Sequence, residues 1–493
     1  MSQITAMTSG ILASYEEKIR SGKAAEVIAS VREKIAHKRP ARDLVLPLAQ
    51  LVRRAGAPGL SIQLLRPIVR PTGRRAEKAS ASEVCAYAAA LVALGIQGEA
   101  LRLLEGVSVK ETPEPTLFKA YARIGQWDYA SAIPLLEEYL RDSRPTDYQR
   151  LVAKVNLAAS LVAEGESVAA ESLLGEIYEK ASSQNLALLK GNALELRAQN
   201  AIFASDWKAA DGFLDEAFAL LADKPYASSL YVRKWKAVSA LLQSRASDAN
   251  AAGVARVRQE AMDQGAWETV RDCDFFLGLA TRDQNLIQKV YFGTPFASYR
   301  ARVRKLAKLK DLPTHFDWGR GRKRIDLADR AGLLAVGLKP ERLVTKLLLV
   351  LCTDLYKPFE VSGLHGWLFP EEFYDPQTSS MRIHQLMARL RAWVRERNLP
   401  IALSEKDGRY RIEPTGLILE LPVDLASDLR ISSREKLARE FGSNSFTLSE
   451  AALRLRVPER TLSRQLGEWI ESGAVLKYNR ARATRYGFKE NLT

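Results

Sequence analysis

The stretch Gly125-Gln-Trp-Asp-Tyr-Ala130 returns three times further along the chain in altered form. The later copies are Gly165-Glu-Ser-Val-Ala-Ala170, Ser205-Asp-Trp-Lys-Ala-Ala210 and Ser247-Asp-Ala-Asn-Ala-Ala252, and successive starts lie 40, 40 and 42 residues apart. Each copy separates two amphipathic segments, so a small residue serves a tight turn and alanines let the next helix pack closely. The period predicts helical hairpins stacked in a row around a shared core.

The same helical pattern extends towards the N-terminus. Apolar residues recur at helical spacing from Ile11 to about Val290, and weaker copies of the turn occur at Ser21-Gly-Lys-Ala-Ala25 and Gly95-Ile-Gln-Gly-Glu-Ala100. We therefore expect residues 1–295 to form an α-solenoid. The pattern resembles degenerate tetratricopeptide-type (TPR-like) repeats, and that resemblance implies a concave surface that binds a peptide or a partner protein. Trp127, Trp207, Trp235 and Trp267 are either seam-filling core residues or ligand platforms.

Charge is distributed unevenly along the chain. Residues 296–493 hold 36 Lys and Arg against 24 Asp and Glu, a net +12, whereas the first 295 residues contribute only +3 of the total +15. A basic excess confined to one region is typical of a protein that binds a polyanion, usually nucleic acid and sometimes an anionic membrane surface. Solubility is the alternative explanation of the charge.

Several classes of protein are disfavoured by the residues present. Cys85, Cys273 and Cys352 lie far apart, so neither a disulfide framework nor a thiolate metal site is expected. The sequence has no phosphate-cradling glycine loop, no nucleophile elbow and only four histidines. It also has no signal-peptide pattern and no apolar run long enough to cross a bilayer. We expect a cytoplasmic protein without enzymatic activity, cofactor, metal or stable membrane insertion.

A basic amphipathic segment at 296–312 follows the array. It is expected to be a helical connector that lies on DNA, on a membrane surface or on a neighbouring domain. The alternative is a solvated last helix of the solenoid.

The pattern changes to mixed α and β after Pro313. The expected elements are extended stretches at 324–327 and 333–336, helices at 340–355, 362–369 and 379–397, a strand at 401–404, a turn at 405–408 and a strand at 410–412. This order is that of a helix-turn-helix closed by a β-hairpin wing. We assign it to a domain at 313–415, followed by a linker at 416–431.

The helix expected at 379–397 has two contrasting faces. One face is an apolar stripe of Ile383, Leu386, Met387, Leu390 and Val394, and the other carries Gln385, Ala388 and Ala392 between arginines. Arginine can donate paired hydrogen bonds to guanine or phosphate, and small residues allow close approach to a groove. A solvated helix face is the alternative. The DNA-binding residues expected in this domain are Arg382, His384, Gln385, Arg389, Arg391, Arg395, Ser404, Lys406 and Arg409.

Two stretches carry a family resemblance. They are Ser379-Ser-Met-Arg-Ile-His-Gln-Leu-Met-Ala-Arg-Leu-Arg391 and Ile401-Ala-Leu-Ser-Glu-Lys-Asp-Gly-Arg-Tyr-Arg-Ile412. Together they resemble the OmpR-type winged-helix effector domain of bacterial regulators. The resemblance implies that the helix reads DNA and that the hairpin is the wing, with Tyr410 as the family's wing tyrosine. Asp407 and Arg409 stand where the family usually has glycines. No receiver domain precedes the region, so phosphorelay control is not implied.

The last region, residues 432–493, repeats the theme. The sequence predicts a second winged helix-turn-helix in this region. Its expected elements are a helix at 432–441, a second helix with a capping-box start at Thr447-Leu-Ser-Glu450, a third helix from Val457 and a hairpin around Asn479-Arg-Ala-Arg482. The DNA-binding residues expected here are Arg460, Thr461, Ser463, Arg464, Arg480, Arg482 and Arg485. Winged helices also serve as protein-docking modules, which is the alternative for this domain.

The predicted fold class is mainly α, an N-terminal α-solenoid of helical hairpins followed by two small α+β winged-helix domains. The predicted function is transcription regulation, with a protein or peptide signal on the array and duplex DNA on the winged helices. A homodimer and a monomer are both compatible with the sequence. The rival hypothesis is a non-enzymatic interaction scaffold whose winged domains dock proteins.

Overall fold

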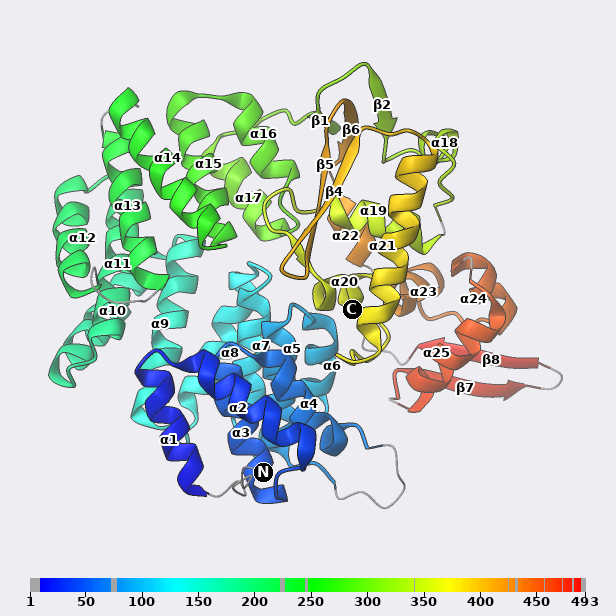
Figure 1. Cartoon of the computed structure of the whole chain (residues 1–493), viewed down its shortest axis with the longest axis horizontal. Coiled ribbons are helices and arrows are strands. Elements are labelled where there is room, and N and C mark those ends of the chain that lie inside the picture. The colour runs from blue at the N-terminus through cyan, green and yellow to red at the C-terminus, as the bar shows by residue number, and fades with distance from the viewer. Residues whose placement is uncertain are drawn as a thin grey trace.

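The chain is a curved helical array followed by two small α+β domains, as the predicted fold class states (Figure 1). The computed structural model describes residues 9–71, 78–221, 227–243, 247–340, 342–423, 425–430, 433–455, 457–471, 473–480 and 483–488. None of the helices in these ranges is both long and apolar enough to cross a membrane.

The first part of the array consists of three helical hairpins. Its helices are α1 (Ser9–Arg20), α2 (Ala24–His37), α3 (Arg42–Arg54), α4 (Pro58–Val69), α5 (Ala81–Ala93) and α6 (Gln97–Glu105). They enclose a core of their own, built mainly from leucine, valine and alanine side chains such as Leu48, Leu65 and Leu91. Ser80 begins α5 with a capping box, because its hydroxyl accepts from Glu83 N–H while the Glu83 carboxylate accepts from Ser80 N–H.

The rest of the array continues the hairpin stack. Its helices are α7 (Glu114–Ile124), α8 (Tyr129–Arg141), α9 (Asp147–Glu164), α10 (Ser167–Ser183), α11 (Ala187–Phe203), α12 (Trp207–Leu221), α13 (Ala227–Gln243), α14 (Asp248–Asp263), α15 (Trp267–Thr281), α16 (Gln284–Phe292) and α17 (Ala297–Leu306). The four copies of the repeated stretch lie at the starts of α8, α10, α12 and α14, the second helix of each hairpin. At two of these starts Asp128 and Ser247 accept a backbone N–H as N-caps.

The basic segment after the array is its last helix. In α17, Tyr299, Arg300 and Val303 are buried, and the Tyr299 hydroxyl donates to Asp272 on α15 at 2.9 Å. The opposite side of α17, including Arg304 and Lys305, is exposed. The segment is therefore packed against the hairpins before it.

Within the described residues, the first α+β domain holds two small sheets and five helices. Its elements are β1 (His315–Gly319), β2 (Lys323–Asp326), α18 (Arg330–Ala335), α19 (Leu343–Leu351), β3 (Phe359–Glu360), α20 (Val361–Leu368), α21 (Ser379–Glu396), β4 (Ile401–Lys406), β5 (Arg409–Pro414), β6 (Leu417–Pro422) and α22 (Leu425–Arg430). One sheet has the order β1-β6-β2 and the other β3-β5-β4. Phe359 pairs with Tyr410, and Leu403 with Ile412, in the second sheet.

Two sequence expectations in this region were wrong. Residues 416–431 are not a linker, because β6 lies between β1 and β2, with Phe316 opposite Leu421 and Ile325 opposite Leu419. Residues 333–336 are not extended, because Asp329 caps α18 by accepting from Gly332 N–H at 3.1 Å. The first domain thus reaches beyond residue 415.

The second α+β domain has three helices and a hairpin. Its elements are α23 (Ser433–Phe441), α24 (Leu448–Leu455), α25 (Glu459–Glu471), β7 (Val475–Arg480) and β8 (Ala483–Phe488). The expected capping box forms, since Thr447 N–H donates to Glu450 at 2.7 Å and Glu450 N–H donates to the Thr447 hydroxyl at 3.2 Å. Leu462, Leu466 and Trp469 face its core, which is separate from the rest.

Array and first domain share one hydrophobic core. The cluster runs without interruption from Leu194 on α11, through Val303 on α17, to Leu419 on β6. A continuous core means that the chain cannot be cut near residue 296 without exposing apolar surface on both sides. The second half of the array is therefore part of the structural support of the first α+β domain.

Candidate nucleic-acid interface

Helix α21 presents the two faces that its sequence predicts. Ile383, Met387 and Leu390 are fully buried against the domain core, whereas Gln385, Ala388 and Arg395 on the other side are exposed. Because 3.6 residues make one turn, a stripe repeating every three to four residues turns the intervening positions outward. The exposed face has a ridge of small or uncharged side chains bordered by arginines.

Hairpin β4–β5 lies beside α21 and ends in a two-residue turn. Asp407 has φ 54° and Gly408 has φ 72°, so both adopt the left-handed conformation that a type I′ hairpin turn requires. Asp407 therefore fills the position where the resembled family usually has glycine. At this tip Lys406 is exposed, and so is Ser404 on β4.

Some predicted cations face open solvent. Arg389 and Arg395 on α21 and Lys406 on the hairpin are exposed and make no ion pair within the part of the chain that the structure describes. Each can approach a phosphate without first breaking an internal contact. These three side chains, with the exposed Gln385 one turn before Arg389 on α21, are the most available part of the expected interface.

Other predicted residues are held by the domain itself. His384 Nδ1 and the Tyr410 hydroxyl share a hydrogen bond of 2.8 Å, and Arg391 Nη2 lies 3.6 Å from a Glu405 oxygen. The Arg409 guanidinium donates to Glu360 at 3.1 Å. Such contacts fix the hairpin to α21 and to β3, so these residues position the interface as well as line it.

Arg382 is engaged on two sides. Its guanidinium pairs with Glu372 and lies 3.8 Å from the centre of the Phe369 ring. Both partners belong to the segment between α20 and α21, which the sequence analysis did not single out. Arg382 would have to exchange these contacts for a phosphate or a base.

Helix α25 carries a second exposed polar surface. A shallow groove of about 440 Å³ is lined by Arg460, Thr461, Ser463 and Arg464, the four residues that the sequence predicts. Arg464 Nη2 lies 3.8 Å from Glu372, the same carboxylate that pairs with Arg382. One acidic side chain thus joins the two helices that are expected to read DNA.

The wing of the second domain differs from its prediction. Arg485 does not project freely, because its guanidinium donates to Ser445 Oγ at 2.8 Å and to the Ser445 carbonyl at 2.7 Å. The cause is the pairing of β8 with the segment before α24, through a bridge between Phe446 and Tyr486. Arg482 and the side chain of Arg480 lie outside the described residues.

Two basic residues near α21 were missed by the sequence analysis. Lys339 and Arg342 lie just before α19 and line a groove of about 560 Å³ together with Arg389 and the indole of Trp393. The signal available in the sequence was a pair of cations at the start of an apolar helix. Anions are favoured at a helix N-terminus, so this groove extends the basic surface beside Arg389.

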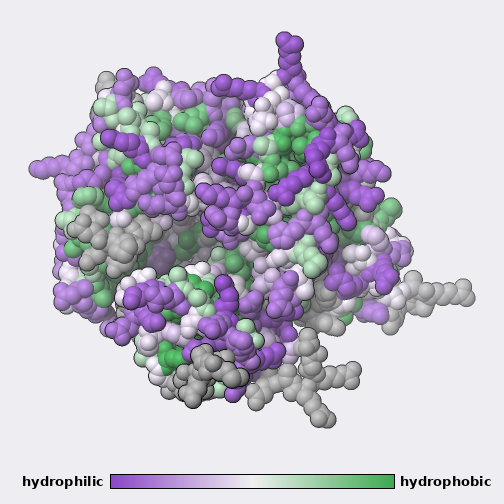
Figure 2. Space-filling view, in the orientation of Figure 1, coloured by the Kyte–Doolittle hydropathy of each residue, from purple (hydrophilic) through white to green (hydrophobic). Residues whose placement is uncertain are grey.

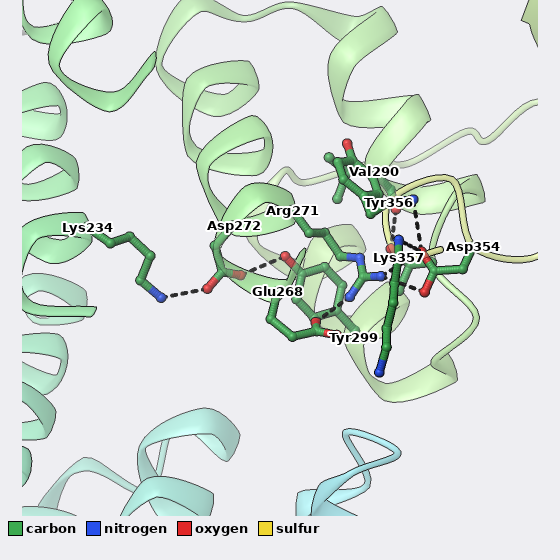
Figure 3. A network of polar contacts seen from close by, with 10 residues as sticks. Lys234, Glu268, Arg271, Asp272, Val290, Tyr299, Asp354, Tyr356 and Lys357 are labelled. Carbon is green, nitrogen blue, oxygen red and sulfur yellow. Dashed lines mark hydrogen bonds and ion pairs between the residues drawn. The ribbon is translucent and has the colours of Figure 1, made fainter. Parts of the chain in front are cut away.

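The array fixes the first domain through a buried polar network (Figure 3). Arg271 on α15 is fully buried, and its Nη2 lies 2.9 Å from both oxygens of Asp354. Its Nη1 also pairs with Glu268. Asp354 accepts in addition from the backbone N–H groups of Tyr356 and Lys357, both at 2.9 Å. Beside it, Lys234 Nζ lies 2.8 Å from Asp272, which is the partner of Tyr299.

The tryptophans of the array are mostly packing residues. Trp235 is buried, and the Trp127 ring lies 4.5 Å from the Tyr299 ring in an edge-to-face contact. Trp267 differs, because it lines a cavity of about 230 Å³ between the array and hairpin β4–β5, with Tyr231, Glu268, Lys357, Glu360 and Arg409. Seam packing accounts for Trp127 and Trp235.

Figure 2 shows a largely hydrophilic face with a hollow between the upper and lower arms of the array.

Burial keeps His365 of the first domain and the cysteine thiols of the chain uncharged near neutral pH. Desolvation lowers the pKa of His365 to about 4, and neither ring nitrogen has a hydrogen-bond partner among the described residues. The three cysteines are buried and unpaired, and desolvation raises the thiol pKa of Cys85 and of Cys273 to about 12. Within the described ranges no group of three or more His, Cys, Asp or Glu side chains could hold a metal ion.

No family model matches the chain, and no curated protein matches it. Among solved structures the chain is similar to a Rap protein, whose crystal structure is described as a complex with competence and sporulation factor. That similarity has a TM-score of 0.42 and 12% sequence identity, and it covers 78% of this chain and 98% of the other. No function is transferred to this chain from it.

Proposed function

We propose that the chain is a DNA-binding transcriptional regulator acting in the cytoplasm. Its first α+β domain is proposed as an OmpR-type winged helix, with α21 in the major groove and hairpin β4–β5 on the neighbouring backbone. The second domain is proposed as a further winged helix that reads through α25. The array is proposed to receive a protein or peptide signal on its concave side.

The observation that carries this proposal is the exposed face of α21. A helix enters the major groove when its outer face is narrow, polar and cationic, and Gln385, Ala388 and Arg389 meet these conditions. Arg395, Lys406 and Lys339 extend the cationic surface on either side, where phosphates flank the groove. The net +12 of residues 296–493 supplies the long-range attraction.

The test is selection of duplex DNA from a random library by the full chain at a fixed salt concentration. The full chain is needed because the first domain shares its core with α11–α17. We expect enrichment of one motif, and the spacing of any repeated half-site reports whether two copies bind together. A variant with Arg389, Arg395 and Lys406 changed to alanine should lose the motif.

A matched control removes the same charge elsewhere. Arg32, Lys38 and Arg39 are exposed on the array at or just after α2, and their replacement by alanine should leave the motif enriched. Equal loss of binding in both triple variants would mean that only net charge attracts DNA. No motif in any variant would reject the proposed function.

A protein-docking scaffold is the second candidate. It is supported by α20 and the segment after it, because Ser362 Oγ donates to the Leu94 carbonyl of the array at 3.1 Å and Trp469 of the second domain lies 3.4 Å from Glu371. These surfaces already bind protein within the chain. The same selection separates the candidates, since a scaffold yields no sequence motif.

A further inference from the structure

The array touches the first α+β domain at two places of different character. At one place α15–α17 join it through the continuous core and the buried Arg271–Asp354 pair. At the other place the turn between α5 and α6, with α4, meets α20 and the segment 369–378 (Figure 1). We call the second contact the latch.

The latch is made of a few polar contacts. They are Ser362 Oγ to the Leu94 carbonyl at 3.1 Å, Tyr374 N–H to Glu99 at 2.8 Å, Arg66 to Asp375 at 2.9 Å, and the Arg70 guanidinium 3.5 Å from the Phe373 ring centre. The side chain of Arg66 is 40% exposed, so water can compete for its ion pair. The contact also has an apolar part, because Tyr374 is buried in the core of α1–α6, so opening it exposes this ring and breaks the polar contacts.

The latch also contains unfilled space. A cavity of about 270 Å³ lies between the α5–α6 turn, the end of α20 and the start of the second domain, and its lining includes Gln97, Gln126 and Trp367. The cavity is partly open to solvent, so the two sides of the contact do not pack against each other there. This differs from the continuous core at α15–α17.

The surface under the latch is the one that DNA would need. In a helix-turn-helix the first helix crosses the DNA backbone while the second enters the groove. Here α20 is the first helix, and its first turn carries Ser362, which is bound to the array. A Cβ placed on Gly95 of the array would lie 4.0 Å from the Gly363 Cα, so no phosphate fits between them.

The same segment neutralises cations on both reading helices. Glu372 pairs with Arg382 on α21 and lies 3.8 Å from Arg464 on α25. Glu372 belongs to the segment whose following residues, Phe373 to Asp375, contact α4 and α6. The array, the segment 369–378 and the helices α21 and α25 are therefore linked by one continuous set of contacts.

We infer that the latch is an autoinhibitory contact, in which the α4–α6 end of the array covers α20 and holds Glu372 against Arg382 and Arg464. This inference rests on the proposed function. Release of the latch frees the backbone-facing side of α20 while α15–α17 continue to support the domain. A ligand that changes the curvature of the array would open or close it.

A reversible cross-link tests the latch in the full chain. A Cβ on Gly366 would lie 3.6 Å from the Ile96 Cα, so Ile96→Cys with Gly366→Cys places two sulfurs within disulfide reach. The native cysteines are buried and do not compete. We expect the oxidised protein to bind DNA from the selected motif at least about tenfold more weakly than the reduced protein.

A second variant opens the latch without touching any DNA-facing residue. Arg66→Glu repels Asp375, so we expect tighter DNA binding than wild type and faster hydrogen exchange in residues 361–375. Arg54→Glu is the matched control, because Arg54 pairs at 2.6 Å with Glu16 on α1, away from the latch. It should change neither quantity.

Each outcome has one meaning. A disulfide that does not form, or equal affinity in oxidised and reduced protein, overturns the latch while the proposed function stands. Failure of Arg66→Glu to raise exchange in α20 also overturns it. Absence of a DNA motif from wild type, from the reduced double-cysteine protein and from Arg66→Glu rejects the proposed function, and the latch as a gate for DNA falls with it.

Discussion

The amine of Lys346 is buried, and a positive charge at that position is unfavourable in free energy. It lies on α19 between the two α+β domains, with its Nζ 3.5 Å from the Leu368 carbonyl. The pKa of its ammonium is lowered to about 8, mainly by burial and also by the nearby Lys436, with Glu371 partly offsetting both. Near neutral pH the folded protein therefore holds a poorly solvated cation.

Lys346→Met should stabilise the protein at pH 7, and its advantage over wild type should shrink as the pH rises towards 10.5. The folded pKa of Lys346 lies below its unfolded value, so between pH 8 and 10.5 the unfolded chain binds more protons at this residue and the Lys346 contribution to wild-type stability rises with pH. The full shift corresponds to about 3 kcal/mol, which is the upper bound for the gain in unfolding free energy at pH 7. Denaturant unfolding at pH 7, 8, 9 and 10 measures it.

The control for Lys346 is a lysine in open solvent. Lys38→Met changes an exposed residue after α2 and should leave both the stability and its pH dependence within about 0.5 kcal/mol of wild type. A difference in unfolding free energy between Lys346→Met and wild type that stays constant from pH 7 to pH 10 would contradict the buried-amine account.

At the scale of elements, the segment 369–378 before α21 determines which arginines are available to contact DNA. Glu372→Gln keeps the side-chain shape but removes the charge that holds Arg382 and Arg464. We expect DNA affinity to rise about two- to fivefold, because exposed ion pairs are worth about 1 kcal/mol or less. The slope of log affinity against log salt should steepen by about one or two phosphate contacts.

Glu371→Gln is the neighbouring control for that experiment. Glu371 accepts from the Trp469 indole at 3.4 Å, whereas the neighbouring Glu372 is the carboxylate that meets Arg382 and Arg464. In Glu371→Gln the affinity for DNA and the slope of log affinity against log salt should stay at the wild-type values. An unchanged slope in Glu372→Gln would mean that Arg382 and Arg464 do not reach phosphates.

Helices and the faces of α21 could be predicted because their information is local. The periodic burial of Ile383, Met387 and Leu390 follows directly from spacing. Strand β6 was mistaken for a linker although Leu417, Leu419 and Leu421 alternate with less buried residues, because its partners lie about 100 residues away. Short apolar runs such as 333–336 fit helix and strand equally well.

The sequence predicts which residues the candidate site contains, but it does not predict which contacts those residues make. Exposure of Arg389 and Arg395 follows from the helical repeat of α21. The pairing of Glu372 with Arg382 and Arg464 depends on how three elements meet in space, and the inward turn of Arg485 depends on the bridge between Phe446 and Tyr486. Such long-range contacts leave no periodic pattern in the sequence.

At the scale of the whole molecule, the last hairpins of the array and the first α+β domain share one hydrophobic core. Their common core is crossed by the Arg271–Asp354 pair, in which the guanidinium is fully buried and also lies 5.3 Å from the Tyr356 ring centre. A buried cation of this kind contributes mainly by being matched to its partners. Its removal leaves the buried Asp354 carboxylate without a cation, whereas the side chain of Glu268 is 41% exposed and can be solvated.

Arg271→Met should lower the free energy of unfolding by about 3–5 kcal/mol, because the buried Asp354 carboxylate loses its cation. If array and domain are one unit, hydrogen exchange should accelerate together in α15 and in β4–β6, although these segments are far apart in sequence. Arg54→Met, which breaks an exposed pair with Glu16, should cost about 1 kcal/mol or less. Accelerated exchange in α15 alone would show that the domain stands independently, and a C-terminal fragment would then suffice for DNA selection.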